Sequence, residues 1–208
     1  MLQRGAAVTG EHYLRVSHCL IGLPGAKLGE VRRVISHPQA LAQCEQSLRA
    51  LDGVNCEPVY DTAGSVSMVK ALGDSSVAAV AARRAAELYG MQVLMAEIED
   101  TPANFTRFQI IGREPAAPGE DAKTSIVFSL NNEPGALFRA MSVFALRGID
   151  LTKIESRPLV GRPWEYFFYV DFIGSRTEEK ARRALDNLEE FATCLRVLGS
   201  YPRHRIGG

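Results

Sequence analysis

Polar side chains stand at a predicted turn from a strand into a helix, Ser36-His37-Pro38-Gln39. The Ser36 hydroxyl and the free N–H groups at the start of the helix could together hold a carboxylate. Gln43, one helical turn beyond Gln39, lies on the same face and would add a side-chain amide. The alternative is that Ser36 only caps the helix, which is a common role for serine.

Two further turns repeat this design. The segment Asp61-Thr62-Ala63-Gly64 follows a short strand and opens a helix with Thr62 or Asp61 as its N-cap. The segment 81–84 (AARR) begins with small residues, which allow a ligand to approach the backbone closely. Ligands of open α/β sheets bind beyond the carboxyl ends of the strands. Three such turns on one sheet edge therefore predict a site for a small anion.

A different kind of candidate lies within a strand, at residues 104–108 (NFTRF). Strand alternation puts Thr106 and Phe108 on one face and Phe105 and Arg107 on the other. One interpretation is that this segment belongs to a functional site. The other is an edge strand with a solvated arginine.

A charged cluster precedes an aromatic-rich strand near the end of the chain. Lys153, Glu155 and Arg157, closed by Pro158, stand just before the apolar strand predicted over 164–173. The pattern alone is that of a solvated strand end, and a binding role for these charges follows only from the resemblance described below.

Composition limits the classes of function. The chain has 208 residues, 46% of them hydrophobic and 23% charged, with no formal net charge, which is typical of a soluble globular protein. A neutral chain gives no reason to expect nucleic-acid or membrane partners. The four cysteines lack C-x-x-C spacing and are predicted to be buried free thiols. No set of histidines, cysteines and carboxylates has metal-ligand spacing, and neither a G-x-G-x-x-G motif nor a P-loop occurs, so no metal and no cofactor are expected.

The pattern of elements predicts two folded parts. Strands and helices alternate over 31–112, which indicates an α/β sheet covered by helices. Residues 114–123 contain prolines and a glycine and read as a linker. The remainder, from 124 onward, reads βαββαβ, the ferredoxin-like plan, with Pro134 at the first position of a helix that Gly148 ends.

Eight motifs, in this order, make the sequence recognisable: RVISHPQALAQC, DTAG, ARRAAELYG, NFTRF, NNEPGALF, KIESRP, EYFFYVDF and LRVLGSYP. Together they resemble the prephenate dehydratase family, including its arogenate dehydratase branch, over nearly the whole chain. The resemblance implies an α/β dehydratase domain similar to type II periplasmic binding proteins, then an α+β, ferredoxin-like ACT regulatory domain. The implied boundaries are a partial dehydratase domain at 1–113, a linker at 114–123 and an ACT domain at 124–204.

The resemblance also implies roles for particular residues. Thr106 falls on the threonine that the family needs for catalysis, where it would act as a positioned hydrogen-bond donor to the departing hydroxyl. The implied substrate-binding residues are Ser36, His37, Gln39, Gln43, Thr62, Ala63, Arg107 and Phe108. The implied L-phenylalanine site comprises Asn131, Gly135, Ala136, Leu137, Glu155, Ser156, Arg157 and Pro158.

Family members carry a first lobe with a glycine-rich opening and a proline-isoleucine-glutamate-asparagine-serine motif, and neither occurs here. The expected activity is the decarboxylating dehydration of prephenate or arogenate, and this chain is expected to show none without a partner that supplies the first lobe. The alternative is a non-catalytic phenylalanine-binding regulatory subunit or an inactive fragment. The expected assembly is a homodimer or homotetramer, in a bacterial cytoplasm or a plastid stroma.

Overall fold

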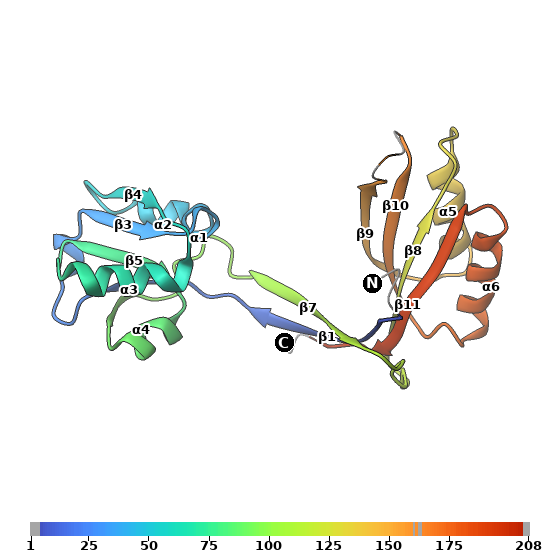
Figure 1. Ribbon diagram of the computed structural model, residues 1–208, viewed down its shortest axis with the longest axis horizontal. Coiled ribbons are helices and arrows are strands. Elements are labelled where there is room, and N and C mark those ends of the chain that lie inside the picture. The colour runs from blue at the N-terminus through green and yellow to red at the C-terminus, as the bar shows by residue number, and fades with distance from the viewer. Residues whose placement is uncertain (1–4, 160, 162–163, 206–208) are drawn as a thin grey trace. The chain divides into compact units, whose positions relative to one another are not determined.

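The computed structural model describes residues 5–159, 161 and 164–205 (Figure 1). The chain forms two compact units: residues 14–106 make one, and residues 1–13 with 107–208 make the other. The first unit is therefore an insertion into the second. Among the described residues, no helix is long and apolar enough to cross a membrane.

The inserted unit is built on a five-stranded sheet with the order β4-β3-β5-β2-β6. The strands are β2 (Cys19–Gly22), β3 (Arg33–Ser36), β4 (Asn55–Pro58), β5 (Val77–Ala81) and β6 (Gln92–Met95). β3 runs parallel to β4 and β5, whereas β2 is antiparallel to β5 and β6. All five residues of β5 are buried, as expected for a central strand covered on both faces.

Helices cover this sheet: η1 (Leu28–Glu30), α1 (Pro38–Gln43), α2 (Glu45–Arg49), α3 (Thr62–Leu72) and α4 (Arg83–Tyr89). α3 follows the terminus rules, since the Asp61 carboxylate accepts from the amide of Gly64 at 2.6 Å and Gly73 ends the helix in the left-handed region. The apolar residues Leu41, Cys44, Leu48 and Leu51 have the spacing of a single helix over 37–51, but Cys44 leaves helical geometry and separates α1 from α2. A tertiary contact explains the break: the Gln43 carbonyl accepts from the amide of Asp100 at 2.7 Å.

The second unit contains a four-stranded antiparallel sheet with the order β11-β8-β10-β9. Its elements are β8 (Ala122–Ser129), α5 (Ala136–Ala145), β9 (Leu151–Pro158), β10 (Tyr166–Ile173), α6 (Glu179–Glu189) and β11 (Cys194–Pro202). This order is the predicted βαββαβ plan, and α5 and α6 pack their apolar faces with the sheet into one core around Phe128, Phe144 and Phe172. The predicted fold class, an α/β lobe followed by a ferredoxin-like domain, is confirmed.

Two details of this unit differ from expectation. Helix α5 begins at Ala136 with Gly135 as N-cap at φ 78°, so Pro134 precedes the helix instead of occupying its first position. β8 begins at Ala122, inside the segment predicted as linker, and all of its residues are buried.

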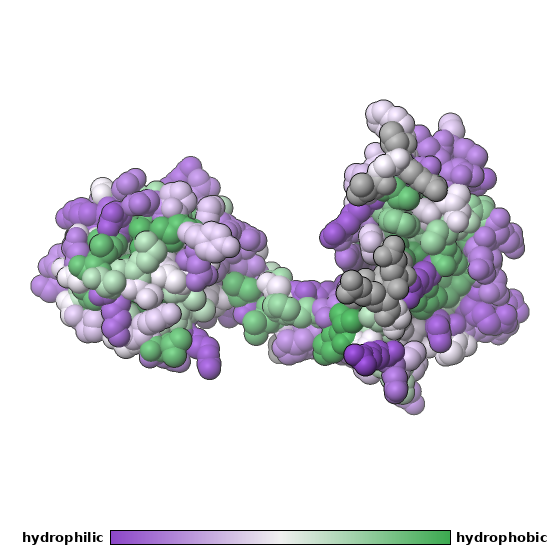
Figure 2. All heavy atoms as spheres, in the orientation of Figure 1, coloured by the Kyte–Doolittle hydropathy of each residue, from purple (hydrophilic) through white to green (hydrophobic). Residues whose placement is uncertain are grey.

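β1 (Ala7–Arg15) and β7 (Phe105–Gly112) pair as a two-stranded ribbon. Apolar side chains are exposed along it, including Phe108 and Ile110, and Figure 2 shows this apolar surface. Near its start, at Val8, β1 passes close to β11. A Cβ on Gly199 of β11 would lie 2.0 Å from the carbonyl oxygen of Val8. A register shift in β11 between Val197 and Gly199 accompanies this close approach.

Candidate functional site

The carboxyl ends of β3, β4 and β5 lie at one edge of the five-stranded sheet, because these strands are parallel. α1 follows β3, α3 follows β4 and α4 follows β5. The three predicted turns therefore meet at one edge, with His37, Asp61 and Ala82 as the N-caps of the three helices. Such an edge is where α/β sheets bind ligands.

Ser36 is fully buried, and its hydroxyl donates to the carbonyl of Val80 at 2.6 Å. This bond joins the ends of β3 and β5. The cap of α1 is instead His37, whose Nδ1 accepts from the amide of Gln39 at 3.2 Å. The reading of Ser36 as the helix cap is therefore wrong, because its hydroxyl is already committed to the neighbouring strand.

The turn at Asp61 is tightly made. The Asp61 carboxylate approaches Gly64 so closely that a Cβ there would lie 2.7 Å from Oδ2. Thr62 is half-buried and Ala63 is exposed in the first turn of α3. The carbonyl of Thr62 accepts from the hydroxyl of Ser65 at 2.6 Å within this first turn.

Gln43 lines a cavity of about 410 Å³ at the end of α1, together with Ala42, Glu99, Asp100, Thr101, Ala103 and Asn104. Its Oε1 lies 2.9 Å from Nε2 of His18. Since an amide oxygen only accepts, His18 donates here, and the amide N–H groups of Gln43 are not used in this bond. Gln43 is thus held in place by a buried ring.

Glu99 completes the wall behind this cavity. Its side chain is 2% exposed, and its carboxylate accepts from the amide of His18 at 2.9 Å and pairs with Arg15 at 3.2 Å. Burial alone would raise the pKa of this carboxyl, but hydrogen bonds from His18, from its own amide and from Ser17, with the charge of Arg15, hold the pKa below its usual value. Glu99 therefore stays ionised near neutral pH.

Two buried polar atoms in this region have no hydrogen-bond partner among the described residues: Nδ1 of His18 and Nδ2 of Asn104. Buried polar groups are nearly always paired, so these atoms mark a place that a polar ligand or water can satisfy. Sequence reasoning did not select His18, and it included Asn104 only as part of the candidate segment 104–108, without a role of its own. Asn104 stands two residues before Thr106, so the cavity and the expected catalytic threonine are close in sequence.

The expected catalytic segment lies in β7. Thr106 and Phe108 are exposed, Phe108 at 51%. Arg107 is only 18% exposed at its side chain and is ion-paired with Glu11 and Asp171. The reading of Arg107 as a solvated arginine is therefore wrong. The structure places Arg107 among residues of the second unit.

The two expected phenylalanine-binding motifs lie at the same end of the four-stranded sheet. Phe167 of β10 pairs with Ser129 of β8 on one side and Arg157 of β9 on the other. Two strand spacings, about 10 Å, therefore separate the two motifs' strands. A cavity of about 390 Å³ at the start of α5 is lined by Asn131 and Ala136, among others.

Glu155 is the acidic centre of the second motif. It pairs with Lys153 at 2.9 Å and with Arg157 at 2.7 Å. Hydrogen bonds from Lys153 and then Arg157 hold the pKa of the Glu155 carboxyl below its usual value. Gly135 and Leu137 are exposed at the start of α5, and Ser156 and Pro158 are exposed in β9.

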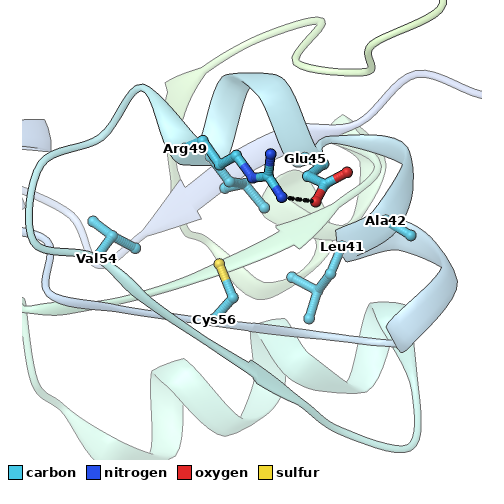
Figure 3. Close-up of a pocket in the computed structure, with 7 residues that line it drawn as sticks. Leu41, Ala42, Glu45, Arg49, Val54 and Cys56 are labelled. Atoms are coloured by element: carbon cyan, nitrogen blue, oxygen red, sulfur yellow. Dashed lines mark hydrogen bonds and ion pairs between the residues drawn. The ribbon is translucent and has the colours of Figure 1, made fainter.

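Another cavity, of about 360 Å³, lies on the outside of the inserted unit between α1, α2 and β4 (Figure 3). Leu41, Val54 and Cys56 form its apolar walls, and Glu45 and Arg49 pair at 2.5 Å beside them. None of the expected site residues lines it, so we do not assign the function to this cavity.

Comparison with known proteins decides the family. The family model for prephenate dehydratase matches residues 1–116, and the model for the ACT domain matches residues 124–190. The chain belongs to the prephenate dehydratase family. The resemblance seen in the eight sequence motifs is thereby confirmed.

Several curated relatives are plant enzymes. The chain is 49% identical over 213 residues to arogenate dehydratase/prephenate dehydratase 2, chloroplastic, of Arabidopsis thaliana, covering 97% of this chain and 56% of the relative. It is 47% identical over 218 residues to arogenate dehydratase 2 of Petunia hybrida, covering 97% and 55%. The chain thus spans about half the length of the curated relatives that it matches.

Solved structures agree on the fold. A prephenate dehydratase from Arthrobacter aurescens in complex with L-Phe is 32% identical with a TM-score of 0.83, covering 96% of this chain and 67% of that one. A structure titled "GqqA- a novel type of quorum quenching acylases" is 39% identical with a TM-score of 0.84, covering 96% and 73%.

Proposed function

We propose that this chain acts in a dehydratase of L-phenylalanine biosynthesis. The reaction converts prephenate to phenylpyruvate, or arogenate to phenylalanine, with loss of water and carbon dioxide. The ring hydroxyl leaves with a proton as water, while the ring carboxylate leaves as carbon dioxide and its bonding electrons enter the ring. Aromatisation supplies much of the driving force, so the protein must position the substrate and assist the departing hydroxyl.

The observation that carries the proposal is the meeting of the Ser36–His37 and Asp61–Thr62 turns at one sheet edge, in a chain of this family. We assign His37, Gln39, Thr62 and Ala63 to the substrate carboxylates, with Ser36 holding the edge together. Gln43 would donate its amide N–H groups into the cavity that it shares with Asn104.

We assign catalysis to the hydroxyl of Thr106. A threonine hydroxyl is a weak acid, so its role is a positioned donor to the leaving oxygen, with Phe108 on the same face of the strand. Such a donor works best where water is excluded, and the exposed Thr106 meets that condition only when another protein surface closes over it.

The test joins this chain to the first lobe of a relative and measures turnover of prephenate and arogenate. Thr106→Ala is expected to lower kcat by about 100-fold or more, since a donor to the reacting oxygen is lost. Thr106→Ser, which keeps the hydroxyl, is the matched control and should retain most activity. Normal kcat in Thr106→Ala would refute the assignment of Thr106.

We further propose regulation by L-phenylalanine at the ACT domain. The ligand ammonium would pair with Glu155, and its carboxylate would meet the N-terminal amides of α5 beyond Gly135. β9 is the edge strand of its sheet and exposes Ile154 at 53%, which supports a homodimer or homotetramer in which two such domains meet. Calorimetry with L-phenylalanine tests this, and Glu155→Gln is expected to weaken binding at least about tenfold.

The chain joined to a first lobe also tests two other functions, a regulatory subunit and an acylase. A regulatory subunit would bind phenylalanine and yet show no turnover even with the first lobe supplied. The likeness to a structure titled as an acylase supports a parallel assay of acyl-amide hydrolysis, in which release of a free amine would favour that activity.

The compartment is proposed to be a plastid stroma or a bacterial cytoplasm. The names of several relatives include "chloroplastic", which supports the plastid stroma.

A further inference from the structure

The side chain of Arg107 is held on all three of its nitrogens by groups of its own unit. Nε donates to Glu11 at 2.7 Å, Nη1 donates to Asp171, and Nη2 donates to the hydroxyl of Tyr201 at 2.8 Å. Glu11 and Asp171 are almost fully buried at their side chains, with 0% and 4% exposed. Arg107 therefore already makes the fork-shaped contacts with which a guanidinium would bind a substrate carboxylate.

The cluster around Arg107 is balanced in charge and closed by further hydrogen bonds. Lys123 pairs with Glu11 at 2.7 Å, so two cations face two carboxylates. The hydroxyl of Ser125 donates to Asp171 and lies 2.7 Å from the hydroxyl of Tyr201. Removal of one partner from such a buried set leaves an uncompensated charge, so the set acts as a unit.

Two members of the cluster, Arg107 and Tyr201, have raised pKa values. Burial alone would lower the pKa of Arg107, but Asp171, Tyr201 and Glu11 raise it above its usual value. Burial raises the pKa of Tyr201 to about 12. Arg107 therefore stays charged and Tyr201 stays neutral near neutral pH.

Members of the cluster come from the β1–β7 ribbon and from the four-stranded sheet β11-β8-β10-β9, which carries the proposed phenylalanine site and is called the regulatory sheet below. Glu11 belongs to β1 and Arg107 to β7, while Lys123, Asp171 and Tyr201 belong to β8, β10 and β11. Thr106 is joined to Arg107 by one peptide bond, and strand alternation turns its side chain to the opposite face. The hydrogen bonds of Arg107 to Asp171 and Tyr201 therefore also fix the position of the adjacent Thr106 backbone.

The same cluster lies one strand away from the proposed phenylalanine site. Asp171 is opposite Lys153 in the pairing of β10 with β9, and Lys153 pairs with Glu155 at 2.9 Å. A ligand ammonium at Glu155 would compete with Lys153 and Arg157 for the same carboxylate. Ligand binding therefore changes the surroundings of the residue that faces Asp171.

We propose that Arg107 is a positioning residue, which holds the strand carrying Thr106 on the regulatory sheet and transmits L-phenylalanine binding from Glu155 to that strand. The path runs from Glu155 through Lys153 and Asp171 to Arg107. The ligand-dependent part of this proposal rests on the proposed regulatory function. The contact of Asp171 with Arg107 in β7 does not depend on that function, because the structure shows this contact directly.

Hydrogen exchange of the 208-residue chain, followed by mass spectrometry on peptides covering 105–112, tests both parts. Without ligand, Asp171→Asn is expected to speed exchange of the β7 amides by about tenfold or more, because the strand loses its hold. With L-phenylalanine, the wild-type chain should slow exchange in β7, and Asp171→Asn should bind the ligand by calorimetry but lose this response. Asp186→Asn, which breaks an exposed pair with Arg182 on α6, is the matched control and should behave as wild type.

Tyr201→Phe removes one acceptor and keeps the ring and both ion pairs, so it serves if Asp171→Asn does not fold. It should produce the same changes with smaller size. Unchanged β7 exchange in these variants without ligand would overturn the positioning role. Failure of the wild-type chain to bind L-phenylalanine would instead refute the proposed regulation, whereas binding without any change in β7 would refute the transmission alone.

Discussion

Nε2 of His18 and Oε1 of Gln43 lie 2.9 Å apart, and this contact joins the start of β2 to the end of α1. His18 is 5% exposed and also donates its amide to Glu99. His18 thereby fixes two groups that line the cavity: its ring holds the side-chain amide of Gln43, and its backbone amide holds the carboxylate of Glu99.

His18→Ala is expected to destabilise the protein, because the Gln43 oxygen loses its donor in a buried place. The expected loss in the free energy of unfolding is about 1–3 kcal/mol, measured by urea denaturation. His37→Ala at the half-exposed cap of α1 is the control and should cost about 1 kcal/mol or less. Equal losses in the two variants would contradict the special role of the His18–Gln43 contact.

Glu99 predicts an acid-dependent loss of stability. The folded state lowers the pKa of this carboxyl from its model-peptide value of 4.5, so the unfolded chain binds the proton more readily. The stabilisation is therefore full above pH 4.5 and is lost as the pH falls through the lower folded-state pKa. In urea titrations across this range, Glu99→Gln should flatten the decline, whereas the exposed Glu45→Gln should not.

The four cysteines should differ sharply in reactivity. Cys19 and Cys44 are buried, while Cys56 and Cys194 are exposed, so the expectation of four buried thiols is wrong for the latter two. Burial, then the charges of Asp100 and Glu99, raise the pKa of Cys44 to about 12. Alkylation of the native protein at pH 8, mapped by mass spectrometry, should label Cys56 and Cys194 first. Early labelling of Cys44 would contradict the packing at the end of α1.

Gly199→Ala should be strongly destabilising although one methyl group is added. Its Cβ would lie 2.0 Å from the Val8 carbonyl, so β1 must move away from β11. We expect a loss of about 3 kcal/mol or more in urea denaturation, the upper end for overpacking. Gly29→Ala, where nothing lies within 4 Å of the added carbon, is the control and should change stability little.

The sequence predicted those features that depend on neighbours in the chain. Asp61 begins α3 and Gly90 ends α4 as the local rules require. The split of the helix at Cys44 was not predictable, since it depends on a bond from the distant amide of Asp100. Strand β1 was also missed.

The candidate site shows the same division. The three turns at one sheet edge follow from the alternation of strands and helices, and sequence reasoning found them. The partners of Arg107 come from β1, β10 and β11, and the partner of Gln43 is His18, which directly precedes β2, so neither set of contacts is visible as a local pattern. Burial of a charge by distant strands is a tertiary effect that only the fold reveals.

The insertion of residues 14–106 into the other unit has a consequence for biosynthesis. On the ribosome the inserted unit is complete early, whereas Val8 must wait for Gly199 to emerge before it can pack. At ~5–20 residues per second this wait lasts on the order of 10 s or more. During that time β1 remains without its place beside β11, exposed to chaperones and proteases, so the second unit is the vulnerable part of this chain.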